Sequence, residues 1–235
     1  MAGDTSPRDD SGRARKGRVI AIDGPAASGK SSTAQWVAQR LAYRHGDSGA
    51  LYRAVTAARF RDGGELDAAK WKEGDVLASA KRHVSFQPSE RSFAALIDGA
   101  ERDEELRSPD VTSRVSAVAR MQSVRAWVNE QMRAAAGHGS IVVDGRDMGT
   151  AVFPDAAVKI FLVADPWERA RRRLIQVLKR APTDEEIAAE TDRLVHRDAK
   201  DAQQTQQAAD AVLLDTTYLT QEEQVDRIVA IATAV

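Results

Sequence analysis

Cysteine is absent from this chain of 235 residues. The absence excludes disulfide bonds, thiolate catalysis and cysteine-ligated zinc, and it is compatible with a reducing cytoplasm. Long apolar runs are missing too: no stretch has the roughly 18 apolar residues of a spanning helix, and no charged-then-apolar signal peptide is evident. We therefore expect a cytoplasmic protein that has no membrane partner.

The sequence also lacks an excess of charge of either sign, because 34 Lys and Arg stand against 35 Asp and Glu. The molecule as a whole has no electrostatic reason to bind nucleic acid, so any anion site must be local. The four histidines show no metal-ligand spacing, and their context suggests no Ser-His-Asp set.

What the chain does have is an ordinary globular composition, with 43% hydrophobic and 29% charged residues. Its length fits one principal domain with an insertion. Residues 1–17 are rich in Asp, Arg, Gly and Ser and hold almost no large apolar side chain. Such a segment cannot bury enough surface to offset its ordering entropy, so we predict a disordered tail and assign it no function.

Short β-branched runs alternate with helical patterns through the rest of the chain. Strands are predicted at 19–22, 141–143 and 158–163, with a hairpin at about 83–99 that forms a small insertion beside the main sheet. Helices are predicted at 34–41, 51–60, 68–80 and 109–136, the last allowing a break, and three more follow the capping residues Asp165, Thr183 and Thr220. This alternation predicts an α/β fold with a parallel sheet covered on both faces.

The connection after the first predicted strand carries a complete phosphate-binding motif. Residues 24–31 satisfy G-x-x-x-x-G-K-[ST] between a strand and a helix. Triphosphate oxygens carry concentrated negative charge, and such a loop offers them backbone N–H groups at a helix N-terminus. Lys30 is then expected to bridge the β- and γ-phosphates, and Ser31 to offer its hydroxyl to Mg²⁺. The predicted ATP phosphate site comprises Gly24, Pro25, Ala26, Ala27, Ser28, Gly29, Lys30, Ser31 and Ser32.

Two further signals each allow two interpretations. Asp144 ends the strand at 141–143 and is either an acid that faces the metal or an ordinary turn residue. An arginine-rich helix at 169–173 is either a solvated surface or the source of an arginine that stabilises charge on the transferring phosphoryl group.

Three segments together resemble the bacterial cytidylate kinases: DGPA at 23–26, DSGALYR at 47–53 and DGRDMGT at 144–150. The likeness continues through 152–156 and 159–162, and it runs in order along almost the whole chain after the tail. The resemblance implies a P-loop three-layer fold like that of adenylate kinase, and transfer of the γ-phosphoryl group of ATP to CMP or dCMP. It further implies a core at 18–60 and 138–235, a monophosphate-binding insertion at about 61–137 and a short lid at about 176–204.

The resemblance also implies roles for single residues of the acceptor site. Arg53 and Arg146 match arginines that clamp the acceptor phosphate, with Ser48 in the same pocket, and guanidinium groups suit this task because they bind phosphate oxygens bidentately. Arg197 and Asp201 match a segment that holds the ribose. The positions that read the cytosine edge are matched by Ser116, Arg125 and Asp147.

The catalytic set implied by the resemblance is Lys30, Arg146 and one arginine of the helix at 169–173. We predict that this arginine is Arg173, with Arg171 as the alternative.

One segment departs from the family pattern. After Asp201 the family continues with another phosphate-binding arginine and a Pro-Leu loop. In this chain residues 202–210 read AQQTQQAAD, and the segment is several residues shorter than in the family. The expected arginine falls near Gln204, and Lys200 could substitute for it in part. Loss of one charge-assisted contact costs about 1.5 to 3 kcal/mol of phosphate binding, which is roughly ten- to a hundredfold in affinity.

These observations predict a monomeric phosphotransferase that uses ATP with Mg²⁺ and acts on CMP or dCMP. Two alternatives stay open. One is a P-loop kinase for another nucleoside monophosphate or for a small metabolite such as shikimate. The other is a regulator that binds ATP but has lost transfer because of the altered segment around Gln204.

Overall fold

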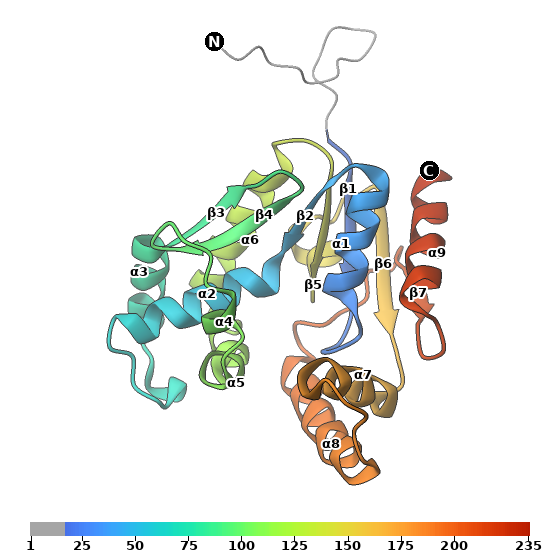
Figure 1. The fold of residues 1–235 in the computed structure, drawn as a ribbon. Helices are drawn as coiled ribbons and strands as arrows, with labels where there is room; N and C mark the ends of the chain where they lie inside the picture. The colour runs from blue at the N-terminus through green and yellow to red at the C-terminus, as the bar shows by residue number, and fades with distance from the viewer. Residues whose placement is uncertain (1–16) are drawn as a thin grey trace, which may run out of the picture.

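A seven-stranded sheet runs through the part of the chain that the computed structural model describes, residues 17–235 (Figure 1). The predicted tail, residues 1–17, therefore lies almost wholly outside the described residues. The strand order is β3-β4-β2-β5-β1-β6-β7, with β3 antiparallel to β4 and the other neighbours parallel. The strands are β1 Val19–Asp23, β2 Arg44–Asp47, β3 Val84–Pro88, β4 Ser92–Ile97, β5 Ile141–Gly145, β6 Val158–Val163 and β7 Val212–Asp215.

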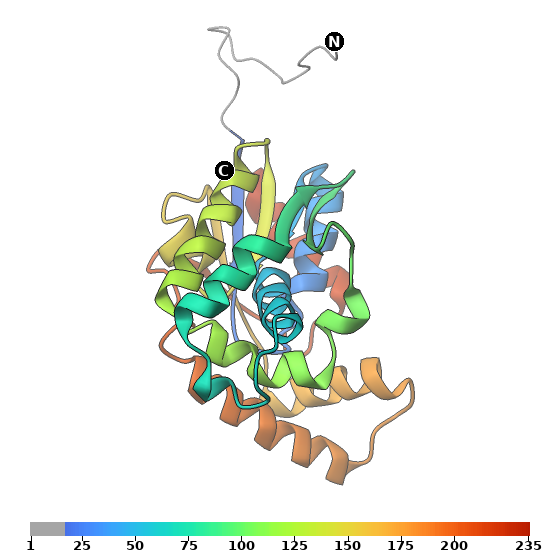
Figure 2. The same cartoon turned by 90° about the vertical axis from the view of Figure 1, so that its left-hand side faces the viewer.

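Helices cover both faces of this sheet and one of its ends. One face packs against α2, α3, α5 and α6, the other against α1 and α9, while α7 and α8 lie together at the carboxyl end of the strands (Figures 1 and 2). The helical elements are α1 Lys30–Leu41, α2 Ser48–Arg61, η1 Ala68–Lys70, α3 Glu73–His83, α4 Asp103–Leu106, α5 Pro109–Val118, α6 Gln122–Ala136, η2 Met148–Val152, α7 Pro166–Leu178, α8 Asp184–Asp201 and α9 Gln221–Thr233.

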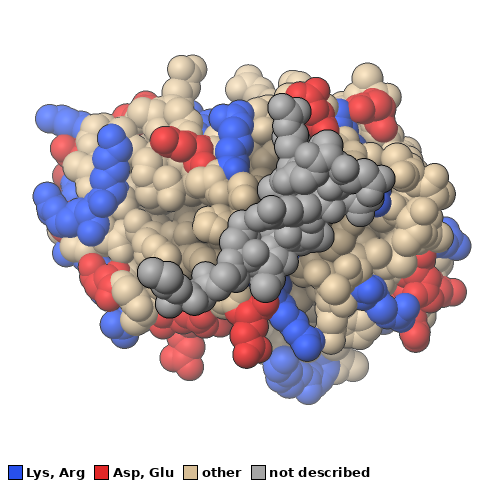
Figure 3. Space-filling view, turned by 90° about the horizontal axis from the view of Figure 1, so that it is seen from above, with Lys and Arg blue, Asp and Glu red and all other residues tan. Residues whose placement is uncertain are grey.

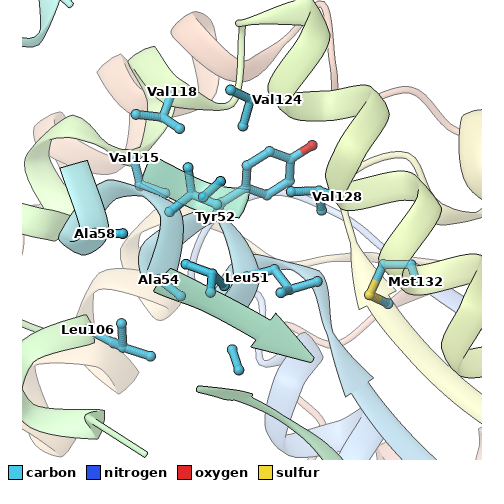
Figure 4. Close-up of a cluster of buried hydrophobic side chains, with 14 of the residues drawn as sticks. Leu51, Tyr52, Ala54, Ala58, Leu106, Val115, Val118, Val124, Val128 and Met132 are labelled. Atoms are coloured by element: carbon cyan, nitrogen blue, oxygen red, sulfur yellow. The ribbon is translucent and has the colours of Figure 1, made fainter. Parts of the chain in front are cut away.

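Strand β5 illustrates why the central strands are apolar throughout. Ile141 and Val143 belong to the core under α2 and α6, part of which Figure 4 shows, whereas Val142 belongs to the core under α1 and α9. Successive side chains of a strand point to opposite faces, so a strand covered on both sides needs apolar residues at every position. The same alternation places Asp144 on the α1 face, at the carboxyl end of the strand.

Most of the expected elements are confirmed. The α/β class is confirmed, the helix at 109–136 is broken between α5 and α6, and the three capping residues accept hydrogen bonds from backbone N–H groups of the helices that follow them. The hairpin is confirmed as β3 and β4, but it joins the edge of the main sheet through β4 and β2 instead of standing beside it. The helix expected at 68–80 is two elements, η1 and α3.

No helix among residues 17–235 is long and apolar enough to cross a membrane. Seen from the amino ends of the strands, the described surface carries acidic and basic side chains interspersed with one another (Figure 3). This agrees with the near balance of charges in the sequence.

Candidate active site

The glycine-rich loop lies between β1 and α1, where the carboxyl ends of β1, β2 and β5 meet. Gly24 has a φ of 148°, and a Cβ there would lie 2.2 Å from the carbonyl oxygen of Leu162 in β6. Gly29 has a φ of 87° and immediately precedes α1. The loop therefore needs glycine at both positions. A side chain at position 24 has no space, and position 29 has a backbone conformation that favours glycine.

Lys30 is buried in this loop. Its Nζ donates to the carbonyl oxygen of Pro25 at 2.5 Å and lies 3.3 Å from the hydroxyl of Ser28. Burial, followed by the nearby Arg146, lowers the pKa of Lys30 below its usual range, although Asp144 opposes this shift. An anion bound here would relieve the cost of keeping two cations close together.

Most of the predicted phosphate-site residues line two hollows, which share Ala27, Lys30 and Ser31. A large cleft of about 870 Å³ is lined by the loop from Ala27 to Ser32, and a smaller cavity of about 260 Å³ is lined by Ala26, Ala27, Lys30 and Ser31. Gly24 and Pro25 line neither, so their part is to shape the loop. The amide N–H of Ala26 is already engaged, because it donates to Oδ1 of Asp198 in α8 at 3.1 Å.

Asp144 faces the first turn of α1, as the metal interpretation of this residue requires. The Ser31 hydroxyl donates to its Oδ2 at 2.6 Å, and Nε2 of His45 lies 2.8 Å from its Oδ1. The Ser48 hydroxyl donates to the Asp144 carbonyl at 2.8 Å. Burial would lower the pKa of His45, but the hydrogen bond with Asp144 raises it above its ordinary value.

The smaller cavity brings together every residue that was predicted for the acceptor site. They come from α2, α5, α6, the segment after β5, and α8, elements far apart in the sequence. The predicted acceptor residues that line it are Ser48, Arg53, Ser116, Arg125, Arg146, Asp147, Arg197 and Asp201. Arg173 and Gln204 line it as well.

One wall of the cavity is a cluster of guanidinium groups. Arg146 donates from Nη1 to the carbonyl oxygen of Gly24 at 3.1 Å and shares the Asp201 carboxylate with Arg197, at 3.4 Å and 3.8 Å. Arg53 pairs with Asp47 at 2.8 Å. Burial, followed by the neighbouring Arg146, lowers the pKa of Arg197. Several cations thus crowd a small volume, which is an arrangement suited to a phosphate dianion.

Another part of the cavity lining is suited to a neutral polar group. Arg125 forms an ion pair with Asp147, and burial raises the pKa of Asp147 even though Arg125 opposes the shift. The hydroxyl of Tyr52 is buried beside them without a hydrogen-bond partner among the described residues. Its ring lies next to Val124 and Val128 (Figure 4). Burial also raises the pKa of Tyr52, so the hydroxyl stays protonated.

The arginines of α7 take four different positions. Arg169 is buried, donates to the carbonyl oxygen of Ala26 at 2.7 Å and pairs with Asp198 at 2.7 Å. Arg171 pairs with Glu168 one turn away at the surface and lines neither hollow. Arg172 donates to the carbonyl oxygens of residues 216 and 217. Arg173 pairs with Glu190 at 2.9 Å and lines both hollows, which Arg171 does not.

Three residues close to this site were not predicted. Asp23, at the end of β1, accepts from the backbone N–H groups of Met148 and Gly149 at 2.8 Å each. Asp198 connects α8 to the loop through Ala26 and Arg169, and His45 contacts Asp144. Asp23 belongs to the DGPA segment and Asp198 follows Arg197, so position beside a recognised motif was the available signal. His45 stands in a polar stretch that carries no strand pattern.

A P-loop beside a second cavity lined by arginines defines the class of protein: a P-loop nucleoside monophosphate kinase. The model of the cytidylate kinase family matches residues 20–234, so the chain belongs to the cytidylate kinase family.

Curated relatives agree with this membership over nearly their whole length. The chain is 40% identical over 219 residues to a cytidylate kinase of Limosilactobacillus reuteri, covering 91% of this chain and 94% of that one. It is 43% identical over 208 residues to a cytidylate kinase of Enterococcus faecalis, covering 87% and 90%. A solved shikimate kinase from Bacteroides thetaiotaomicron is 14% identical, with a TM-score of 0.46, and the match covers 92% of this chain and 98% of that one.

Proposed function

We propose that this protein transfers the γ-phosphoryl group of ATP to CMP or dCMP, giving ADP and CDP or dCDP. The observation that carries the proposal is the cavity of about 260 Å³, because Lys30 and Ser31 of the P-loop line it together with Arg53, Arg146 and Arg197. A donor phosphate at the P-loop and an acceptor phosphate at the arginines would then lie in the same cavity.

In the proposed reaction, an oxygen of the acceptor phosphate forms a bond to the γ-phosphorus while the bond from that phosphorus to the β–γ bridging oxygen breaks. The electron pair of the broken bond leaves with ADP. Little covalent chemistry falls to the protein in such a transfer, so alignment and charge neutralisation supply the catalysis. Lys30 and Arg173 would neutralise charge on the transferring group, and Arg53 and Arg146 would hold the attacking phosphate in line.

The donor groups beside the P-loop fit Mg²⁺. This ion prefers oxygen ligands, takes one or two from the protein, and takes the rest from phosphates and water. Ser31 and Asp144 supply a hydroxyl and a carboxylate 2.6 Å apart, and Ser31 uses its proton toward Asp144, which leaves its oxygen lone pairs available. Bound with ATP, Mg²⁺ would neutralise charge on the β- and γ-phosphates.

The pyrimidine base is assigned to the wall formed by Tyr52, Arg125 and Asp147. The ion pair offers both a donor and an acceptor edge, which is what the amino group, ring nitrogen and carbonyl of cytosine require. Ser116 lines the same cavity and adds a hydroxyl.

The test is ADP release measured with CMP, dCMP, UMP, AMP and shikimate as separate acceptors. We expect the fastest turnover with CMP and dCMP. Arg146→Ala should lower kcat/KM for CMP by roughly ten- to a hundredfold, the worth of a charge-assisted contact. Arg171→Ala is the matched control, because this arginine lies on the surface and lines neither hollow. Equal loss in both variants would contradict the assignment.

The alternative of an ATP-binding regulator is distinguished by the wild type itself. Turnover that depends on an acceptor excludes it. ATP binding that Lys30→Ala abolishes, with no ADP release from any acceptor, would favour it instead.

A further inference from the structure

His45 is a buried polar residue of β2 to which the proposed reaction gives no task. It is 9% exposed, and its Nε2 lies 2.8 Å from Oδ1 of Asp144, 99 positions further along the chain. The register of the sheet explains the contact: His45 pairs with Val142, and Asp144 follows two residues later on the same face of β5. The imidazole therefore reaches the carboxylate diagonally across two parallel strands.

Asp144 is consequently held at both carboxylate oxygens, by Ser31 at Oδ2 and by His45 at Oδ1. A carboxylate only accepts hydrogen bonds, so the ring nitrogen that faces it carries a proton. Two donors from separate elements, α1 and β2, prevent the carboxylate from rotating. Each oxygen still has a lone pair for a further partner.

Packing alone does not account for a histidine at this position. The residue paired with His45 in the adjacent strand is the buried Val142, and an apolar side chain at position 45 would avoid the cost of burying a polar ring. The backbone of Asp144 is fixed independently, because its carbonyl accepts from the Ser48 hydroxyl at 2.8 Å. What His45 adds is the orientation of the Asp144 carboxylate.

We propose that His45 is a positioning residue for the Mg²⁺ that accompanies the nucleotide: by donating from Nε2 it fixes Asp144 beside Ser31, ready for the cation or for water bound to it. This inference rests on the proposed function, since it takes the P-loop to bind a nucleotide with Mg²⁺. Outer hydrogen bonds that orient a metal-binding group typically change metal affinity by ten- to a hundredfold when removed.

Calorimetric titration with ADP, in the presence and in the absence of Mg²⁺, tests the proposal without a phosphoryl acceptor. His45→Met keeps similar bulk and removes the N–H donor, whereas His45→Gln keeps a donor. We expect the Met variant to lose roughly ten- to a hundredfold of the affinity gain that Mg²⁺ gives the wild type, with metal-free ADP binding unchanged. The Gln variant should retain most of the gain, as should the control His138→Gln, whose side chain is exposed.

Two calorimetric outcomes overturn the proposal. One is an equal Mg²⁺ gain in wild type and His45→Met. The other is an equal loss of ADP affinity with and without Mg²⁺, which would mean that His45 only supports the fold. If wild type shows the Mg²⁺ gain but releases no ADP with CMP, the proposed function fails while this inference stands.

A spectroscopic measurement on the wild type covers the case in which His45→Met does not fold. With only four histidines in the chain, ¹⁵N-labelled imidazole signals can be assigned by comparing wild type with His45→Gln. We expect His45 to carry its proton on Nε2 and its signal to shift when Mg²⁺ is added to the ADP complex. A proton on Nδ1 alone, or no response to Mg²⁺, refutes the assignment.

Discussion

At the scale of single residues, Gln204 is the position at which we expected a further phosphate-binding arginine. It lines the acceptor cavity, as the arginine expected there would, and its backbone N–H donates to the carbonyl oxygen of Asp201 at 2.9 Å. A side chain at this position therefore reaches the space in which Arg146 and Arg197 lie. The cavity already holds several arginines, so transfer to CMP can proceed without a further one.

We predict that Gln204→Arg lowers the KM for CMP. A restored guanidinium would add a charge-assisted contact worth about 1.5 to 3 kcal/mol, or roughly ten- to a hundredfold in affinity. Gln203→Arg is the matched control, because the neighbouring residue is exposed and lines neither hollow. The measurement is steady-state ADP release against CMP concentration. A KM that falls equally in both variants, or in neither, would mean that position 204 does not face the acceptor phosphate.

Asp23 gives the stability of the fold a definite dependence on pH. Burial raises its pKa from 3.8 to about 6, although the N–H groups of Met148 and Gly149 oppose the shift. Between about pH 4 and pH 6, Asp23 is therefore more often protonated in the folded protein than in the unfolded chain. The contribution of Asp23 to the free energy of unfolding is therefore fully present below about pH 4 and is lost as the pH rises through about 6.

We predict that Asp23→Asn weakens the dependence of stability on pH. The raised pKa of Asp23 is worth about 3 kcal/mol. The free energy of unfolding of the variant should therefore fall by about 3 kcal/mol less than that of the wild type between pH 4 and pH 7. Urea unfolding across this range measures it. Asp155→Asn serves as control, because Asp155 is exposed. Identical pH profiles for wild type and Asp23→Asn would show that Asp23 is ionised throughout.

At the scale of elements, the sequence predicts those helices and strands whose own residues show a motif or an apolar periodicity. The P-loop, β5, β6 and the capped helices each combine a local motif with apolar periodicity, and their positions are as predicted. Strand β2 reads Arg-His-Gly-Asp and was not predicted, because its place in the sheet comes from pairing with β5 and β4 and not from its own composition. Strand β7 was also missed: it is only four residues long and lies at the sheet edge.

Site residues were predictable where they belong to a recognised sequence segment. Residues inside recognised segments, such as Arg53 and Arg146, could be carried over from the resemblance by position. His45 and Asp198 act through contacts to Asp144 and Ala26, partners that are 99 and 172 positions away. Such contacts are made by sheet register and helix docking, which the order of residues does not reveal.

α8 is held on the P-loop by contacts that mutation can test. Asp198 pairs with buried Arg169 at 2.7 Å and accepts from Ala26, so Asp198→Ala would leave a buried guanidinium without its carboxylate. Breaking such a pair costs about 3 to 5 kcal/mol. We expect faster amide hydrogen exchange across α8, with exchange in β1 and β5 little changed.

A control in the same helix is Asp192→Ala, because Asp192 is exposed. Exchange in α8 that is as slow in Asp198→Ala as in this control would mean that apolar contacts of Ile187 and Leu194 hold the helix without the ion pair.

At the scale of the whole molecule, the positive charge that lines the small cavity favours closure of the site only when nucleotides are bound. The arginines of α2, α8 and the segment after β5 repel one another across the small cavity until an anion enters it. To exclude water from the transfer, we expect α8 and the insertion at about 61–137 to come together. Each nucleotide neutralises only part of this charge, so we expect complete closure when both are bound.

Trp167 can report this closure, because it lies in the first turn of α7 and is 38% exposed. Stopped-flow fluorescence with a non-hydrolysable ATP analogue and CMP should give a partial change with either ligand and the full change with both. Trp167→Phe is the control that assigns the signal to α7, which packs against α8, since Trp36, Trp71 and Trp127 remain in that variant. A signal that stays flat under every addition would mean that the cavities are already closed before the substrates bind. Transfer without leakage to water would then depend on the fixed packing of α8 against the P-loop.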